Sequence, residues 1–328
     1  DPECYAISWY RPNILESINA GYPSAQGTII NQQFKTIAAF AAIYLVWGTT
    51  YFAIAIALNS VAPFTIAALR FGLATLIAAA LLMIQRPGLK GIPVVRSLVS
   101  GVLFGGMGNG FVIYAQQGVP SGIAALVVTT VPVVVLLLDW LGFSKRPPGP
   151  RAALGLLLAL IGVAAIIAES KSFSGPTPFI SMGFLLAAVF AWSIGTLILP
   201  GRTRAEQLLG VTFLQMIGGM SFALVLSFVN NEWSAGLVAT FSAVSAPGFW
   251  AIVYLAVFGS IVTQNCYVWL LTHQPAPKVA TYALVNPVVA VLLGTLVLRE
   301  PITATIIAGS ALVLFGVALV LFRRFLQA

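Results

Sequence analysis

The chain has 328 residues, of which 59% are hydrophobic and 7% are charged, and its formal net charge is +8. A soluble domain carries roughly 25% charged residues, so this composition, with a mean hydropathy of +1.00, excludes a soluble globular protein. The basic residues stand in short joints between apolar runs rather than in one cluster, so membrane topology explains them and no nucleic-acid partner is expected. An all-α protein that crosses a membrane several times is therefore predicted.

Residues 1–35 form a polar start of the chain and lack the basic-then-apolar layout of a secretory signal peptide. We expect an extramembrane leader here, with a remnant of an expression vector as the alternative for part of it. Cys4 in this leader and Cys266 in an apolar run make neither a disulfide framework nor a CxxC metal site. No cofactor and no metal are therefore expected.

Apolar runs near the roughly 20 residues that cross a hydrocarbon core of ~30 Å as a helix follow the leader in succession. Glycine, proline or polar residues separate them. Ten spanning helices are predicted, at roughly 36–58, 63–84, 95–117, 121–141, 150–168, 179–199, 206–229, 247–271, 277–298 and 302–322. The longest joint, 230–246, is expected to hold a short helix at the membrane surface.

The basic residues divide unequally between alternate joints of this segmentation. Thirteen of the 16 Lys and Arg residues fall on one side, only Lys171 and Arg299 fall on the other, and Arg70 lies inside a span. Cytoplasmic joints of membrane proteins carry the excess of basic residues, so both termini are predicted to be cytoplasmic. Termini on one side require an even number of spans.

The second half of the chain repeats the first at an offset of about 155 residues. The matched residues are Pro120 with Pro275, Pro132 with Pro287 and, one residue out of step, Gly155 with Gly309 and Gly162 with Gly316. Apolar segments match easily by chance, but matched prolines and a matched glycine pair do not. Near the front of each half Trp47 aligns with Trp192, which places Arg70 opposite Gln215.

Each repeat contains five predicted helices. The first repeat covers 36–168 and the second covers 179–324, with a periplasmic linker at 169–178 between them. Because five is odd, the second repeat enters the membrane from the opposite face. Two inverted five-helix repeats of this kind characterise secondary transporters, whose substrate site lies near the midplane between the halves.

Three stretches resemble a known family. They are YLVWGTTYF in the first predicted helix, ALRF in the second and TYALVNPVVAVLLGTLVLREPIT in the ninth and tenth. They resemble the drug/metabolite transporter superfamily, in particular its EamA-type bacterial exporters, and within it the YddG-type exporters of aromatic and other amino acids. The resemblance implies a multi-pass carrier in the bacterial inner membrane, and it is too general to name the substrate.

The chain departs from this family pattern at the end of the fourth helix. Members often end the fourth and ninth helices with a Gly-Glu-Arg-like sequence. Here Glu300 follows the ninth helix, whereas the fourth has Asp139 followed by Lys145 and Arg146. A mechanism that requires matched glutamates on the two sides is therefore not expected.

Arg70 is the first candidate for substrate binding. It lies about seven residues into its helix, roughly 10 Å below the membrane boundary at 1.5 Å per residue, and a charge at such depth marks a functional candidate. One interpretation is that it binds the carboxylate of an amino acid or another anionic metabolite. The other is that it satisfies neighbouring polar groups and ties helices together. The resemblance favours the second, because it implies a basic residue here across members with different substrates.

Aromatic residues supply further candidates. Tyr44, Trp47 and Tyr51 recur at helical spacing and share one face, and Trp192 of the second half is expected to face the same cavity. The alternative is an aromatic belt at the membrane surface.

Polar residues and prolines inside the spans complete the candidate set. They are Asn109 and Tyr114 in the third helix, Gln264, Asn265 and Trp269 in the eighth, and Tyr282 and Asn286 in the ninth. Amides inside a span need partners, so hydrogen bonds between helices are the alternative to substrate contact. Pro132 and Pro287 predict kinks in the fourth and ninth helices, where freed carbonyls can line a pathway.

The predicted function is export of small metabolites, foremost aromatic and large apolar amino acids, by alternating access. Asp139, Glu300 and His273 all lie toward helix ends, which favours export driven by the substrate gradient over proton antiport. Nucleosides are the alternative cargo, and a channel also stays open. No GxSxG, HExxH or P-loop sequence supports an enzyme. We expect a monomer whose partners are a small-molecule substrate and membrane lipid.

Overall fold

The computed structural model describes residues 25–86, 91–143, 145, 147–169, 177–198, 207–274 and 276–322, and its regular elements are all helical. Contacts divide the chain into two units, Asp1–Ala38 and Ala39–Ala328, and the second unit holds the bundle considered below. Of the predicted leader, residues 1–24 lie outside the described residues, as do residues 170–176 of the predicted linker.

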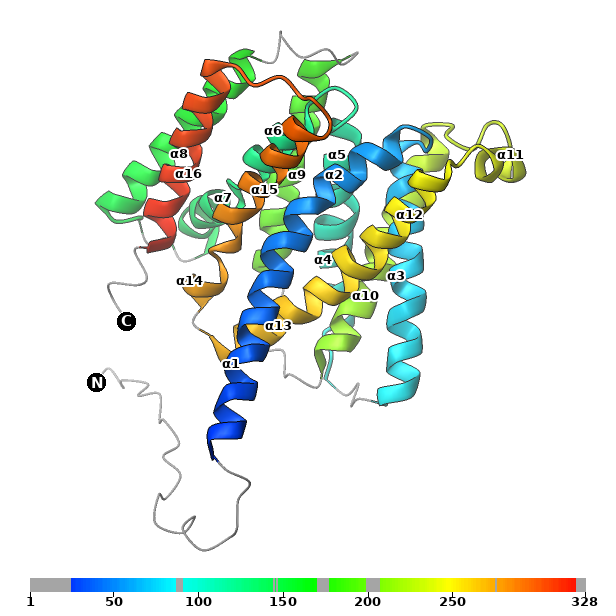
Figure 1. Cartoon of the computed structure of the whole chain (residues 1–328), viewed down its shortest axis with the longest axis horizontal. Helices are drawn as coiled ribbons and strands as arrows, with labels where there is room; N and C mark the ends of the chain where they lie inside the picture. The colour runs from blue at the N-terminus through cyan, green and yellow to red at the C-terminus, as the bar shows by residue number, and fades with distance from the viewer. Residues whose placement is uncertain are drawn as a thin grey trace, which may run out of the picture. The chain divides into compact units, whose positions relative to one another are not determined.

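Five of the ten predicted spans are built from more than one helical segment (Figure 1). In chain order the segments are α1 (Ala25–Ala41), η1 (Ala42–Val46), α2 (Trp47–Leu58), α3 (Pro63–Gln85), α4 (Val94–Gly101), η2 (Val102–Asn109), α5 (Gly110–Ala115), α6 (Ser121–Val128), α7 (Val131–Leu138), η3 (Asp139–Phe143), α8 (Pro150–Glu169), α9 (Pro178–Ile198), α10 (Leu208–Val229), α11 (Leu237–Ser242), α12 (Ala246–Tyr254), η6 (Leu255–Val262), α13 (Thr263–His273), α14 (Ala276–Val279), α15 (Tyr282–Leu296) and α16 (Ala304–Phe322). The η segments are π-helical turns, which are frequent at functional sites.

Nine helices among the described residues are long and apolar enough to cross a membrane. The tenth, α15, has 15 residues and is about 22 Å long at 1.5 Å per residue, short of a full hydrocarbon core. The predicted ninth span, 277–298, is thus divided, with α14 ending at Val279 and α15 beginning at Tyr282. At this break the carbonyl oxygens of Lys278, Ala280 and Thr281 accept turn-type hydrogen bonds from the backbone N–H groups of Thr281, Ala283 and Leu284.

The predicted kinks take two different forms. Pro132 lies in the first turn of α7, after a break at Thr129 and Thr130, where its missing N–H costs nothing. Pro287 lies inside α15, which continues through it. The fourth span is therefore interrupted before its proline rather than at it.

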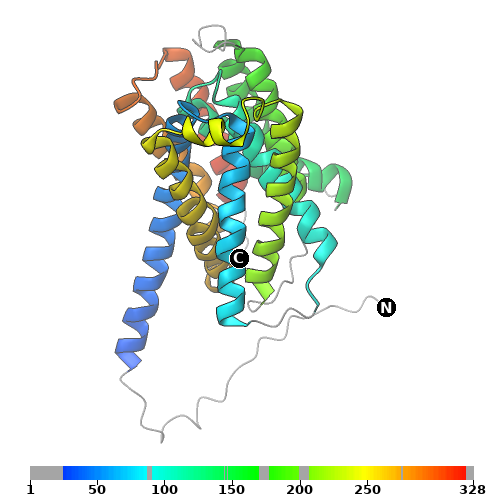
Figure 2. The same ribbon diagram turned by 90° about the vertical axis from the view of Figure 1, so that its right-hand side faces the viewer.

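Helices of one half pack mainly on helices of the other. Pairs that pack closely include α3 with α10, α6 with α15, α8 with α16, α2 with α12, and η2 and α5 with α9. Figure 2 shows α3, in light blue to cyan, beside α10, in yellow-green. Exchanging equivalent helices of the two repeats turns this set of pairs into itself, which is the pattern of a two-fold axis between the halves.

The contact between α8 and α16 gives the direction of that axis. A methyl group on Gly155 would lie 2.5 Å from the carbonyl oxygen of Gly316, and one on Gly162 would lie 2.6 Å from that of Gly309. Residue numbers rise along one helix while they fall along the other, so these equivalent helices are antiparallel. The predicted all-α fold of two inverted five-helix repeats is therefore confirmed.

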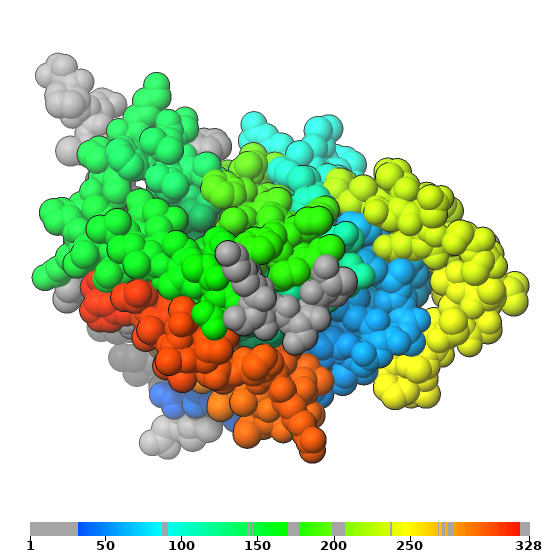
Figure 3. Space-filling view, turned by 90° about the horizontal axis from the view of Figure 1, so that it is seen from above, coloured from blue at the N-terminus to red at the C-terminus, as the bar shows by residue number. Residues whose placement is uncertain are grey.

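The predicted helix in the joint 230–246 is α11. In the space-filling view from above (Figure 3), α11 and its neighbours in yellow occupy one edge of the bundle, opposite the red α16. Buried residues of α8 and α16, among them Ala159 and Val313, share a hydrophobic core with Leu126 of α6 and Val134 of α7.

Candidate functional site

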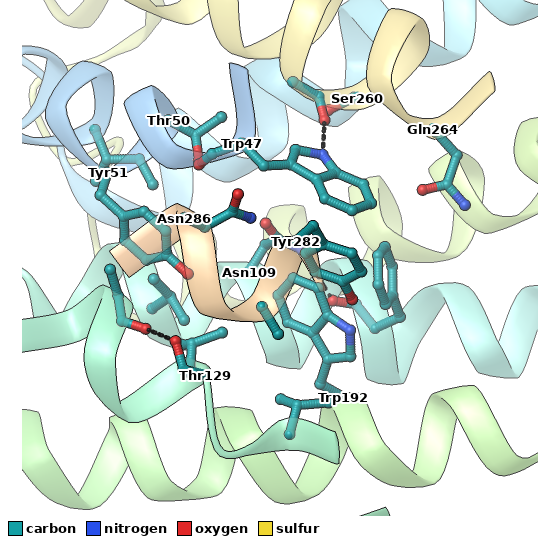
Figure 4. Close-up of a pocket in the computed structure, with 18 of the residues that line it drawn as sticks. Trp47, Thr50, Tyr51, Asn109, Thr129, Trp192, Ser260, Gln264, Tyr282 and Asn286 are labelled. Carbon is teal, nitrogen blue, oxygen red and sulfur yellow. Dashed lines mark hydrogen bonds between the residues drawn. The ribbon is translucent and has the colours of Figure 1, made fainter. Parts of the chain in front are cut away.

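A pocket lies between the two halves (Figure 4). It encloses about 850 Å³, its open mouth included, and its lining comes from α2, α3, η2, α5, α6, α7, α9, α10, η6, α13 and α15. Nine of the residues predicted from the sequence line it: Trp47, Tyr51, Arg70, Asn109, Pro132, Trp192, Gln264, Tyr282 and Asn286. Residues from both repeats therefore lie together in this pocket.

Trp47 and Trp192 supply an indole from each half. The Trp47 Nε1 donates to the carbonyl oxygen of Gly259 in η6 over 3.2 Å, and its ring centroid lies 4.9 Å from that of Tyr282. Trp192 meets Phe104 of η2 edge to face, with centroids 4.5 Å apart. Both indoles thus line the pocket and contact π-helical turns, Trp47 through Gly259 of η6 and Trp192 through Phe104 of η2.

Arg70 is buried, with 4% of its surface exposed. Its Nε donates to Ser260 Oγ over 2.9 Å, which joins α3 to η6. Its Nη1 is buried and has no hydrogen-bond partner. A hydrogen bond between helices thus uses the Nε of Arg70 but leaves its Nη1 without a partner. A buried polar nitrogen without a hydrogen bond costs free energy.

Gln215, the residue aligned with Arg70, makes a similar contact without the charge. Its Nε2 donates to Ser100 Oγ over 3.1 Å, and Ser100 Oγ donates to the carbonyl oxygen of Gly195 over 2.9 Å. Both aligned residues therefore bond a serine in the third helix of the opposite half. Only the Arg70 side of the molecule places a cation at the pocket.

Asn286 has a structural role in addition to its place in the lining. With its amide turned to suit its surroundings, the nitrogen shares its two N–H groups among the carbonyl oxygens of Tyr44 at 3.0 Å, Ile43 at 3.2 Å and Tyr282 at 3.2 Å. Two of these carbonyls belong to η1, where the π-helical turn disturbs the regular ladder. Asn286 thus fastens α15 to the first span.

The structure places four of the predicted contact residues elsewhere. Tyr44 shares a hydrogen bond of 2.6 Å with Thr281, and Tyr114 packs on Phe64 and Phe184. Asn265 is exposed on α13, because Gln264 points into the pocket and neighbours on a helix point about 100° apart.

Trp269 is also outside the lining and stacks on His273, with centroids 4.2 Å apart. Pro287 does not line the pocket either. The face expected to carry Asn265 and Trp269 together is therefore not part of the pocket.

Sequence reasoning missed several lining residues. Thr50, Thr129 and Ser260 add hydroxyl groups, and Phe71 and Met216 add apolar surface. In the fourth helix, Thr129 lies four residues after Ala125 and therefore on the same helical face, which was the signal available for these two lining residues. Ser260 gave no signal, since its partner Arg70 is 190 positions away.

Trp47→Phe is expected to destabilise the protein more than Trp192→Phe, by about 1 kcal/mol. Both changes shrink the ring, but only the first removes a described hydrogen bond, and it leaves the carbonyl oxygen of Gly259 with Thr263 Oγ1 as its described side-chain donor. The melting temperatures of the two variants in the same detergent provide the measurement. Equal losses would show that the indole N–H contributes nothing.

Comparison with known proteins also divides the chain into two matching halves. Residues 34–168 and 179–322 each match the model of the EamA-like transporter family. The chain is 31% identical over 298 residues to "Uncharacterized inner membrane transporter YedA" of Escherichia coli K12, which covers 90% of this chain and 93% of that protein. It is 26% identical over 281 residues to a "Probable amino-acid metabolite efflux pump" of the same organism, covering 84% and 90%. A solved crystal structure with 19% identity has a TM-score of 0.58 over 88% of this chain and 97% of the other, a likeness of fold.

Proposed function

Because the chain belongs to the EamA-like transporter family, we propose that it exports small metabolites, foremost amino acids with aromatic or large apolar side chains, by alternating access of the pocket. The chain is a multi-pass transporter of the inner membrane and not an enzyme. The cargo, the cytoplasmic placement of both termini and the monomeric state belong to the proposal.

The observation that carries this proposal is the composition of the pocket between the inverted halves. It combines an indole from each half, Trp47 and Trp192, with the buried guanidinium of Arg70. Such an amino acid offers a side chain to the aromatic walls and a carboxylate to the guanidinium. The relative named as a probable amino-acid metabolite efflux pump and the resemblance to YddG-type exporters favour the same cargo.

The same pocket bears on the driving force. None of the described residues that line it is Asp, Glu or His, and a proton relay needs a titratable group of that kind near the midplane. We therefore expect the substrate gradient to drive export.

Counterflow in liposomes tests the cargo. Vesicles that contain the purified protein and unlabelled phenylalanine should accumulate labelled phenylalanine and leucine in a saturable manner, with or without an uncoupler. Trp192→Ala should weaken apparent affinity about tenfold, because it removes an aromatic wall. Trp250→Ala is the matched control, since Trp250 is 66% exposed and does not line the pocket.

Each contrary outcome points to a different alternative. Counterflow of adenosine without any amino acid would replace the cargo by nucleosides. Flux that does not saturate and shows no counterflow would indicate a channel. Collapse of flux on adding an uncoupler at a fixed substrate gradient would indicate proton coupling.

A further inference from the structure

We infer that Arg70 is the carboxylate anchor of this pocket and that its substrates are organic monocarboxylates with an apolar body, for which the α-ammonium group of an amino acid is dispensable. The inference rests on the proposed function, since it concerns the substrate class of the same pocket. It differs from that function in one chemical respect. The deaminated analogue of an aromatic amino acid binds at least as well as the amino acid itself.

The first support is the incomplete hydrogen bonding of Arg70. Its Nε is occupied by Ser260 Oγ at 2.9 Å, and Ser260 Oγ donates in turn to the carbonyl oxygen of Leu255 over 3.1 Å, which fixes it as an acceptor. The buried Nη1 has no partner. A guanidinium keeps its charge at neutral pH, and its planar fork matches the two oxygens of a carboxylate.

The second support is the close approach of η6 to the guanidinium. A methyl group on Gly259 would lie 3.4 Å from the Arg70 Nη2 and 3.1 Å from the Thr50 Cγ2. Because the residue is glycine, the backbone of η6 approaches the guanidinium without placing a side chain against Nη2. Ser260 and Gly259 therefore hold the guanidinium at η6, while its Nη1 has no hydrogen-bond partner.

The third support is the charge balance of the lining. Arg70 is the one charged side chain among the described residues that line the pocket. A monocarboxylate neutralises it, a zwitterionic amino acid leaves one positive charge uncompensated, and an amine leaves two. Since an uncompensated charge is costly to bury, the ligand that carries only a carboxylate should bind best.

The hydroxyl groups of the lining explain why an ammonium group is tolerated. Thr50 Oγ1 donates to the carbonyl oxygen of Trp47 over 2.6 Å, and Thr129 Oγ1 donates to that of Ala125 over 2.9 Å. Their hydrogens are used within their own helices, so their oxygens face the pocket only as neutral acceptors. Neutral acceptors can solvate an ammonium group but do not select for it.

Three ligands that share a phenylethyl body separate the contributions. Binding of phenylpropanoate, phenylalanine and phenylethylamine is measured by calorimetry on the full chain in nanodiscs at pH 7. Phenylpropanoate is expected to bind at least as tightly as phenylalanine and at least about tenfold more tightly than phenylethylamine. Counterflow with the same three compounds should follow the same order.

Arg70→Gln is the informative variant, because the repeat already places a glutamine at the equivalent position. Gln215 bonds Ser100 there, so a glutamine in the first half can keep the bond to Ser260 and with it the fold. The variant should lose about tenfold or more in affinity for both carboxylates and none for phenylethylamine. Arg70→Lys, which keeps the charge, should keep the order of the three ligands.

The outcomes separate this inference from the proposed function. It is overturned if phenylethylamine binds as tightly as phenylpropanoate, if phenylalanine is transported but phenylpropanoate is neither bound nor transported, or if Arg70→Gln changes no affinity. Transport of phenylpropanoate without phenylalanine would uphold it and reject amino-acid export. If Arg70→Gln does not fold, the order of the three ligands on the unaltered protein decides.

Discussion

Replacing Gly155 and Gly162 together by alanine is expected to separate α8 from α16 and to destabilise the folded protein by roughly 2–6 kcal/mol. The two new methyl groups would lie 2.5 Å and 2.6 Å from backbone carbonyl oxygens of the facing helix. Backbone atoms cannot turn aside as a flexible side chain can, so the whole helix must move away. Overpacking costs about 1–3 kcal/mol per site and occasionally more, against a total stability of about 5–15 kcal/mol.

The measurement is the melting temperature and the yield of monodisperse protein in detergent. Gly183→Ala is the matched control, because Gly183 is also in a helix and a methyl group on it would have no neighbour within 4 Å. This control should be neutral or stabilising by up to about 1 kcal/mol, since alanine is the better helix former. A double variant as stable as the control would contradict the close contact between α8 and α16.

The same two glycines show what the sequence could predict. Their match with Gly309 and Gly316 revealed the repeat, and the odd number of helices in each repeat revealed the inversion. Trp47 and Trp192 were found by the same alignment, and both line the pocket. These predictions succeeded because the length of the apolar runs and the internal repeat can both be read directly from the sequence.

The rotation of each helix was harder to predict. Gln264, Asn265 and Trp269 were all assigned to the pocket, but of these three only Gln264 lines it. Polar residues stand at successive positions of α13, and because successive residues of a helix point in different directions, they do not show which side faces a pocket. The π-helical turns η2 and η6 shift the direction of the side chains that follow them and had no signal in the residue pattern.

Two glutamates outside the spans add a feature that the sequence showed only in part. Glu232, which follows α10, accepts from the backbone N–H groups of Phe64 at 3.1 Å and Thr65 at 2.6 Å at the start of α3. Glu300, which follows α15, accepts from the first two backbone N–H groups of α6 at 2.7 and 3.1 Å. Each carboxylate caps a helix of the other half, where the free N–H groups and the helix dipole favour negative charge.

The repeat places no acidic residues at the corresponding positions of the opposite end of the bundle. The residues aligned with Glu232 and Glu300 in the first half are Pro87 and Lys145, and neither can accept such hydrogen bonds through a side chain. The departure from matched glutamates noted in the sequence is thus a difference between the two ends. Under the proposed alternating access, opening of the end where α3 and α6 begin is expected to break these two charged caps, and the side chains of proline and lysine cannot form such a cap.

The double variant Glu232→Gln, Glu300→Gln is therefore expected to open that end more often. The glutamine side chains keep the shape but lose the charge, and a hydrogen bond to a charged group contributes about 1.5–3 kcal/mol. Amide hydrogen exchange at the starts of α3 and α6 should accelerate about tenfold or more, while α8 exchanges as before. Glu169→Gln is the control, since Glu169 makes no hydrogen bond or ion pair to the described residues. Equal acceleration in α8 would signal a general loss of stability, and unchanged exchange at α3 and α6 would show that the two caps do not hold this end closed.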